Sequence, residues 1–275
     1  MWIMNVSYWG FNQYIIQRAL AAKDLAEAQK GVLFAAFLKL LMPVIVVLPG
    51  IAALMLVTDI EKPDQAYPKM MALLPTGVLG LVFAALIAAI VASLASKINS
   101  VSTIFTLDFY NKRSRRADAT PHDETHLVKV GRIAATVAIV LAVLTAKPLL
   151  GSFDQGFQYI QEYTGFFTPG IVVIFVLGLF WKRANEAGAI AAAVGSFALS
   201  IALKLAWPEL PFMDRVGLVF LLALALAVVV SLTLRASSDP NRIRTDDVSY
   251  ATTSTFNAGA VGVIGILIAL YAAFW

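Results

Sequence analysis

The sequence contains no cysteine and only two histidines, His122 and His126. Without cysteine the chain has neither disulfides nor thiolate metal sites. Both histidines lie in one polar loop, where we expect them to be solvated rather than bound to a metal. Charged residues make up only 14% of the chain, whereas soluble domains contain about a quarter. Together with 60% hydrophobic residues and a mean hydropathy of +0.80, this scarcity predicts an integral membrane protein.

Long apolar runs divide the chain into membrane spans, each of which needs about 20 apolar residues. A shorter, mixed segment at 2–20 precedes them and predicts a partial helix. The semi-polar stretch 154–166 predicts a helix that continues into the following run and is bent at 164–170. The seven runs lie at about 31–58, 77–97, 128–146, 167–181, 187–206, 215–234 and 257–275. The expected fold is therefore all-α, with about seven full transmembrane helices after a partial, discontinuous one.

The distribution of lysine and arginine predicts the orientation. Fifteen of the 21 basic residues fall in one set of alternate loops, five fall in the other set, and Lys39 lies within a span. The basic set comprises the loops 16–30, 97–132, 182–186 and 235–256. The positive-inside rule places these loops in the cytoplasm, so the C-terminus, Trp275, is expected outside. The KRSRR run at 112–116 is then a topogenic or lipid-facing loop, and no nucleic-acid partner is expected.

Lys39 is a charged residue inside an apolar run. A lysine at the centre of a membrane helix costs about 2.5–3.5 kcal/mol on insertion scales, so its amine should face protein, water or a polar ligand. The alternative is that the Lys39 side chain extends to the cytoplasmic interface. Lys39 lies about 13 Å along the helix from Lys30, the basic residue nearest that interface. We expect a functional role but keep both interpretations.

The segment FDQGFQYIQEYTGFFTPG, residues 153–170, places amides and an acid next to helix-breaking residues. The polar residues are Gln155, Gln158, Gln161 and Glu162. Non-helical backbone at membrane depth is tolerated only against protein or a water-filled cavity. Interrupted hydrophobic segments of this kind indicate a transporter's binding site near the bilayer midplane. The alternative is a re-entrant extracellular loop that caps the bundle.

Ser93, Ser96 and Ser100 fall near one face of a helix rich in small residues. Such faces commonly mediate close helix packing, with the hydroxyls bonded to a neighbouring backbone. Hydroxyl and carbonyl oxygens are also the ligands of a hard cation such as sodium. The pattern alone favours packing over ion binding.

Four segments resemble the sodium/solute symporter family and, within it, the bacterial sodium/galactose (sodium/glucose-type) cotransporters. They are YWGFNQYIIQRALAAKDLAEAQKG, FAALIAAIVASLASKINSVSTIFTLDFY, FQYIQEYTGFFTPG, and GLFWKRANEAGA at 178–189. The likeness runs from about residue 2 to the end and keeps its order and spacing. It implies a core of two five-helix inverted repeats, with substrate and sodium bound beside broken helices.

The resemblance implies roles for six residues at the substrate site. It places sugar contacts at Asn5, Lys39 and Gln161. It places an inner-gate tyrosine at Tyr8 with Trp9 beside it, and an outer-gate aromatic at Phe157. The chemistry is suitable, because amides and an amine satisfy sugar hydroxyls that both donate and accept hydrogen bonds.

The resemblance also implies a sodium site on the 77–97 helix. The matching positions are Ala89, through its carbonyl, and the adjacent pair Ala92 and Ser93. Two adjacent hydroxyls are expected there, but the first is Ala92 in this sequence, which removes one oxygen ligand. Sodium is the implied coupling ion, and no cofactor is implied.

By the same resemblance, six or seven helices that a family member has before residue 1 are absent from these 275 residues. The sequence is therefore expected to be the C-terminal part of a symporter, from an interrupted reading frame or a partial sequence, whose missing partner is the N-terminal half. We expect a single membrane domain over 1–275. It would consist of the remainder of a broken core helix at 1–20, core helices at 31–181 and peripheral helices at 187–275.

The expected function is sodium-coupled symport of a monosaccharide similar to galactose or glucose, in a multi-pass protein of the cell (inner) membrane. The chain alone is expected to be inactive. The alternatives are a symporter for another small solute, or a membrane protein or remnant with a structural or interaction role. An enzyme is not expected, because no metal-ligand cluster, Ser/His/acid set or phosphate-binding glycine loop occurs at membrane depth.

Overall fold

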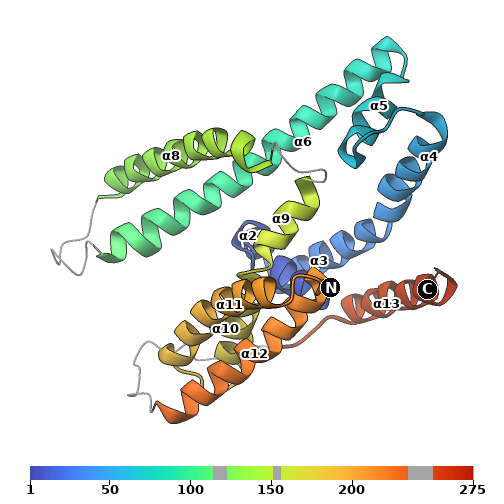
Figure 1. The fold of residues 1–275 in the computed structure, drawn as a ribbon. Helices are drawn as coiled ribbons and strands as arrows, with labels where there is room; N and C mark the ends of the chain where they lie inside the picture. The colour runs from blue at the N-terminus through green and yellow to red at the C-terminus, as the bar shows by residue number, and fades with distance from the viewer. Residues whose placement is uncertain (114–122, 151–155, 235–249, 275) are drawn as a thin grey trace. The chain divides into compact units, whose positions relative to one another are not determined.

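The computed structural model describes residues 1–113, 123–150, 156–234 and 250–274, with the side chains of 147–150 left out (Figure 1). Within these ranges the ordered elements are all helices, and no β-strand is present. Most of them are α-helices, and three short stretches are π-helices. The all-α fold predicted from the sequence is confirmed.

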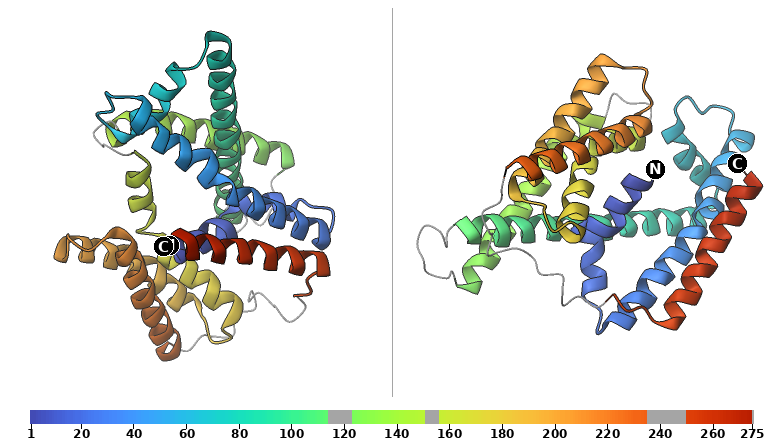
Figure 2. Two further views of the ribbon diagram at one scale, coloured as in Figure 1. Left: turned by 90° about the vertical axis from the view of Figure 1, so that its right-hand side faces the viewer. Right: turned by 90° about the horizontal axis from the view of Figure 1, so that it is seen from below.

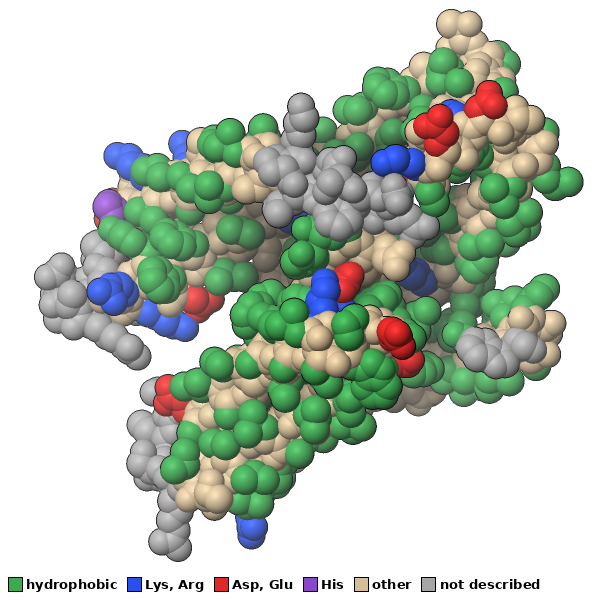
Figure 3. Space-filling view, viewed as in Figure 1, with side chains coloured by type: hydrophobic (Ala, Val, Ile, Leu, Met, Phe, Trp, Pro, Cys, Tyr) green, Lys and Arg blue, Asp and Glu red, His purple; other side chains and the backbone are tan. Residues whose placement is uncertain are grey.

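Six of the described helices are long and apolar enough to cross a membrane. A seventh span is formed if the bent pair Gly156–Thr164 and Thr168–Phe180 counts as one. The six are Leu25–Leu56, Thr76–Asn111, Glu124–Ala146, Glu186–Ala206, Phe212–Thr233 and Ser254–Phe274. Hydrophobic side chains cover most of the face seen in Figure 3, and charged side chains form separate patches among them. The chain is therefore a multi-pass membrane protein with about the number of spans predicted.

By its internal contacts the chain divides into two units. The first comprises Met1–Leu38 and Phe157–Trp275, and the second comprises Lys39–Gly156. The first unit is built around α10 (Thr168–Phe180), α11 (Glu186–Ala206) and α12 (Phe212–Thr233), which pack against one another (Figure 1). Its buried core consists of Val173, Ala192, Ala223 and Ala227.

Small residues allow these three helices to approach closely. A Cβ atom at Gly170 would lie 2.7 Å from the Ala192 carbonyl oxygen and 2.7 Å from Ser196 Cβ. A Cβ atom at Gly188 would lie 2.8 Å from the Ala227 carbonyl oxygen. Without a hydrophobic driving force between helices in lipid, such close backbone packing is a main source of association.

Asn185 joins the start of α11 to the end of α12. Its Oδ1 caps α11 by accepting a hydrogen bond from the Gly188 amide at 2.8 Å. Its Nδ2 donates to the carbonyl oxygens of Ser231, at 3.1 Å, and Leu234, at 2.7 Å. One side chain therefore satisfies terminal backbone groups of two helices, which would otherwise lack partners.

The N-terminal segment is an interrupted helix, as predicted. It consists of α1 (Trp2–Val6), the π-helix η1 (Ser7–Phe11) and α2 (Gln13–Leu20). Asn12 separates the last two with an extended backbone, φ −87° and ψ 115°. The segment packs against α10, where the Phe11 and Phe175 rings stack with centroids 4.6 Å apart.

Two further helices, α3 (Leu25–Leu40) and α13 (Ser254–Phe274), run side by side (Figure 2). All of α3 except its last two residues belongs to the first unit. Gln29 ties them together: its Nε2 donates to the Ala251 carbonyl at 3.0 Å, and its Oε1 accepts from the Thr253 amide at 3.0 Å. Leu33 packs directly over Gly259. α3 begins six residues earlier than the predicted span at 31–58, so Glu27 belongs to this helix and forms an ion pair with Lys30.

The second unit continues from the end of α3. It consists of η2 (Pro43–Val47), α4 (Leu48–Leu56), η3 (Pro63–Gln65), α5 (Ala66–Ala72), α6 (Thr76–Thr103), η4 (Ile104–Asn111) and α8 (Glu124–Leu150). Proline has no N–H to donate within a helix, and the π-helical stretch η2 begins at Pro43. α6 and α8 pack at Gly131, whose carbonyl accepts from the Ser102 hydroxyl at 2.8 Å.

Candidate functional site

The clearest feature of the first unit is a bend within one membrane span. α9 (Gly156–Thr164) and α10 meet at an angle of 43° across three residues. The bend lies within the Thr-Gly-Phe-Phe-Thr-Pro-Gly sequence at 164–170, so the predicted bent helix is confirmed. Backbone groups freed at such a break must find partners away from water.

Ser196 of α11 supplies those partners. Its Oγ accepts from the Gly170 amide at 3.0 Å and donates to the Phe166 carbonyl at 2.9 Å. The residue is 0% exposed, so neither group can bond to water instead. The Thr168 hydroxyl donates to the Thr164 carbonyl across the same bend, at 2.8 Å. The polar backbone groups at the break are therefore hydrogen-bonded, to Ser196 of the neighbouring helix α11 and to Thr168.

α9 carries two of the residues predicted to bind or enclose a substrate. Gln161 is half-buried, and Phe157, four residues earlier, is 74% exposed. Side chains four residues apart lie on one face of a helix. The Gln161 carbonyl accepts from the Gly165 amide at 2.9 Å, so Gln161 lies directly at the start of the bend.

The N-terminal segment carries three more predicted residues. Asn5 lies in α1, and Tyr8 and Trp9 follow in η1, so the three are spaced to share a helix face. The Tyr8 and Trp9 rings meet edge to face, with centroids 5.5 Å apart. π-Helical turns such as η1 occur frequently at functional sites.

Tyr14 is a partner of Tyr8 that the sequence pattern did not indicate. The Tyr14 hydroxyl donates to the Tyr8 hydroxyl at 2.7 Å, across the break at Asn12. Their rings lie edge to face with centroids 5.9 Å apart. A tyrosine six residues away becomes a neighbour only because the helix is interrupted, so the break itself was the available signal.

Lys39 lies near the C-terminal end of α3 and is exposed within the second unit. Asn5 and Gln161 belong to the first unit, and both are carried by segments that continue into or pack on α10. The assembly of these three residues into one sugar site stays a prediction.

The predicted sodium positions Ala89, Ala92 and Ser93 all lie on exposed surface of α6. Their spacing of three and four residues places them on one face of the helix. Further along α6, Ser100 is buried and Ser102 bonds to Gly131 of α8, so these hydroxyls serve helix packing. The described residues contain no group of three or more His, Asp or Glu side chains that would hold a metal.

Of the two histidines, His126 lies within the described residues and His122 does not. His126 lies in the first turn of α8 rather than in a loop, and its Nε2 lies 2.9 Å from the Tyr110 hydroxyl. His126 is exposed and Tyr110 is half-buried. His122, Gln155 and Trp275 lie outside the described residues.

A charged cluster at the bend was not anticipated from the sequence. Glu162 Oε1 accepts from Arg215 Nη2 at 2.8 Å and from Lys204 Nζ at 2.9 Å. We refer to Glu162, Arg215 and Lys204 as the charged cluster. Ionisable residues within membrane helices face the bundle interior and pair with one another, so Arg215 in the first turn of an otherwise apolar helix was a signal. Its partner, 53 residues away, was not identifiable from the pattern.

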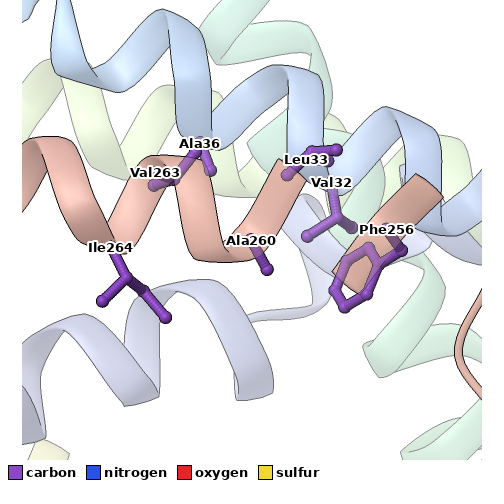
Figure 4. Close-up of a pocket in the computed structure, with 7 residues that line it drawn as sticks. All are labelled: Val32, Leu33, Ala36, Phe256, Ala260, Val263 and Ile264. Carbon is purple, nitrogen blue, oxygen red and sulfur yellow. The ribbon is translucent and has the colours of Figure 1, made fainter. Parts of the chain in front are cut away.

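An apolar groove lies between α3 and α13 (Figure 4). Its lining consists of Val32, Leu33, Ala36, Phe256, Ala260, Val263 and Ile264. A sugar needs hydrogen-bond partners for its hydroxyls, and these side chains offer none. The groove is therefore not a candidate for the predicted substrate site.

Comparison with known proteins gives a consistent result. Residues 2–195 match the model of the sodium:solute symporter family. The chain is 46% identical over 293 aligned residues to the sodium/glucose cotransporter of Vibrio parahaemolyticus, covering 100% of this chain and 53% of that protein. It is 40% and 39% identical to sodium/myo-inositol cotransporter 2 of Oryctolagus cuniculus and Homo sapiens, over 69% of this chain and 30% of each relative. The chain therefore spans about half the length of the first relative and less of the others.

Proposed function

The chain belongs to the sodium:solute symporter family, and from that premise we propose that it forms part of a sodium-coupled symporter for a monosaccharide similar to galactose or glucose. Membership of a transporter family indicates a transporter rather than an enzyme. The name of the Vibrio relative supports a hexose as the substrate. The names of the mammalian relatives support a second candidate, myo-inositol, which also presents a ring of hydroxyls.

The observation that carries the proposal is the bent span formed by α9 and α10. Interrupted helices provide binding groups near the midplane of secondary transporters. Here the interruption is stabilised by Ser196, and the half-buried amide Gln161 lies directly beside it. An amide both donates and accepts hydrogen bonds, which is what a sugar hydroxyl requires.

We assign the remaining roles as the family resemblance implies them. Asn5 and Lys39 bind the sugar together with Gln161. Tyr8 and Trp9 close the path to the cytoplasm, and Phe157 closes the path to the outside. The Tyr8–Tyr14 hydrogen bond, which spans the break at Asn12, supports the gate assignment because it holds the Tyr8 ring in one orientation.

The sodium ion would bind at the Ala89 carbonyl and the Ser93 hydroxyl on α6. Sodium is a hard cation that prefers oxygen ligands, and Ala92 contributes a methyl group where a second hydroxyl would strengthen the site.

The protein would lie in the cell (inner) membrane. The distribution of lysine and arginine supports a cytoplasmic location for the segments 16–30, 97–132, 182–186 and 235–256, which include helix ends as well as loops, and an outside location for the C-terminus. We further propose one membrane domain, with core helices up to 181 and peripheral helices from 187. The match to the family model covers residues 2–195 and so extends into α11.

Transport by alternating access requires one repeat or bundle to move against another around a fixed site. Since the chain spans 53% of its Vibrio relative, we expect these 275 residues alone not to concentrate sugar. Vesicles that contain only this chain should show no sodium-dependent sugar uptake, and uptake by such vesicles would refute this expectation.

The test uses a chimera in which the chain replaces the aligned segment of the Vibrio cotransporter, reconstituted into vesicles. Gln161→Ala and Lys39→Ala should each weaken uptake of labelled galactose or glucose. Gln158→Ala, the same chemical change at an exposed position of α9, is the matched control. Unchanged uptake with Gln161→Ala would defeat the site assignment, and uptake of myo-inositol in preference to the hexoses would select the second candidate.

A further inference from the structure

The charged cluster has no role in the sugar and sodium contacts proposed above, yet it lies beside them in the chain. Glu162 directly follows Gln161, and one of its carboxylate oxygens accepts from both cations. The three side chains differ in burial: Arg215 is 6% exposed, Glu162 is 27% and Lys204 is 41%. Arg215 therefore depends most on its partner, because burying an unpaired charge is costly.

Aromatic rings surround the two cations. Lys204 Nζ lies 5.6 Å from the centroids of both Tyr163 and Phe166, and Arg215 Cζ lies 5.9 Å from that of Phe166. Cations over ring faces at these distances are attracted by the ring quadrupole. Phe166 is itself buried and belongs to the three-residue connection between α9 and α10. The cations are thus fixed at the bend.

The members of the charged cluster come from both sides of that bend. Arg215 lies near the start of α12 and Lys204 in the last turn of α11, so both belong to the packed group α10–α12. Glu162 lies on α9, none of whose residues is buried. The charged cluster therefore attaches α9, which buries none of its own residues, to the well-packed group α10–α12. At the bend itself, a Cβ at Gly165 would lie 3.0 Å from Val216, the residue after Arg215.

We propose that the Arg215–Glu162 ion pair fixes the angle of α9 against α10, and that Arg215 is thereby a positioning residue that presents Gln161 to the substrate. This role rests on the proposed function. Lys204 adds a second, more solvated contact and is auxiliary. Because Phe157 lies on the same short helix, one angle sets both the binding amide and the outer-gate ring.

The position of α9 is measured in the full 275-residue chain in lipid nanodiscs. The chain has no cysteine, so Ile160→Cys on α9 and Val194→Cys on α11, both exposed, take spin labels without background. A second pair, Val194→Cys with Leu221→Cys, reports on α11 and α12 alone. Pulsed electron resonance should give one narrow distance distribution for each pair.

Glu162→Gln and Arg215→Gln should broaden or shift the α9–α11 distribution and leave the α11–α12 distribution unchanged. Lys204→Gln should have a smaller effect. Glu27→Gln is the matched control, because it breaks an exposed 2.7 Å ion pair with Lys30 by the same chemical change. Arg215→Gln could also alter the α11–α12 distance, because Arg215 lies on α12. In that case the Glu162→Gln result decides whether the ion pair positions α9, because Glu162 lies on α9 itself. An unchanged α9–α11 distribution in Glu162→Gln, or equal effects of Lys204→Gln and Arg215→Gln, would overturn the proposal.

The effect on substrate binding is measured in the chimera. Glu162→Gln should raise the sugar concentration for half-maximal uptake about tenfold, the order expected for a residue that acts through another. The maximal rate should change much less, and Glu27→Gln should change neither. If Gln161→Ala has no effect, the substrate site is wrong while the spin-label result still decides the ion pair. If Gln161→Ala weakens uptake but Glu162→Gln does not, the positioning role is refuted.

Discussion

Replacing Ser196 by alanine tests whether the bend is built into the fold. The Ser196 hydroxyl accepts from the Gly170 amide at 3.0 Å and donates to the Phe166 carbonyl at 2.9 Å. Ser196→Ala removes the hydroxyl to which both backbone groups are bonded, at a position that is 0% exposed. A buried polar group left without a partner costs about 1–3 kcal/mol. Hydrogen bonds between membrane helices average about 0.6 kcal/mol, because the unfolded chain in the membrane also finds partners.

In Ser196→Ala two backbone groups each lose a partner, and the cost of each is lower in a membrane than in water. We therefore expect the free energy of unfolding to fall by about 1–3 kcal/mol in total. The assay is reversible unfolding of the chain in mixed micelles by a denaturing detergent, followed by circular dichroism. Ser200→Ala is the matched control: Ser200 is buried one turn further along α11 and is not bonded to these two groups. A loss for Ser196→Ala that is no larger than the loss for Ser200→Ala would refute the reasoning.

Four further substitutions test separate parts of the account. Gly170→Ala should destabilise the chain by about 1–3 kcal/mol in the same assay, because its Cβ would lie 2.7 Å from the Ala192 carbonyl oxygen; a neutral effect would show that α10 and α11 are not so close. Asn185→Ala should cost about 0.5–2 kcal/mol, measured likewise, since the side chain caps α11 and bonds α12; a cost near zero would argue against that clamp. Tyr14→Phe should cost about 1 kcal/mol and raise the exposure of Tyr8 to chemical modification, and unchanged modification would remove the support for an ordered gate. In the chimera, Ala92→Ser should lower the sodium concentration for half-maximal transport, and an unchanged value would exclude this position as a ligand.

The number and places of the membrane spans were predictable because bilayer thickness sets a length that an apolar run either meets or does not. The bend at 164–170 was predictable for a similar local reason, since Pro169 cannot continue the hydrogen-bond ladder and glycine tolerates the change. The interruption within 2–20 followed from its mixed polarity, although the residue at which the helix breaks, Asn12, did not.

The partners that stabilise these features were not predictable from the pattern. Ser196 reads in sequence as one small residue among many in α11, and only the packing of α10 on α11 brings it to the freed backbone groups. Glu162 looked like a member of a polar group with Gln158 and Gln161, but its partners lie on α11 and α12. Local periodicity determines which residues form a helix, whereas these contacts depend on how helices far apart in the chain pack together.

The central claim is tested most directly by whether sodium drives sugar accumulation through a protein that contains this chain. Vesicles carrying the chimera should accumulate labelled galactose or glucose above the external concentration under an inward sodium gradient. The accumulated sugar should leave the vesicles when the gradient is dissipated with an ionophore. Uptake that only equilibrates, and that is the same with and without the sodium gradient, would contradict sodium-coupled symport.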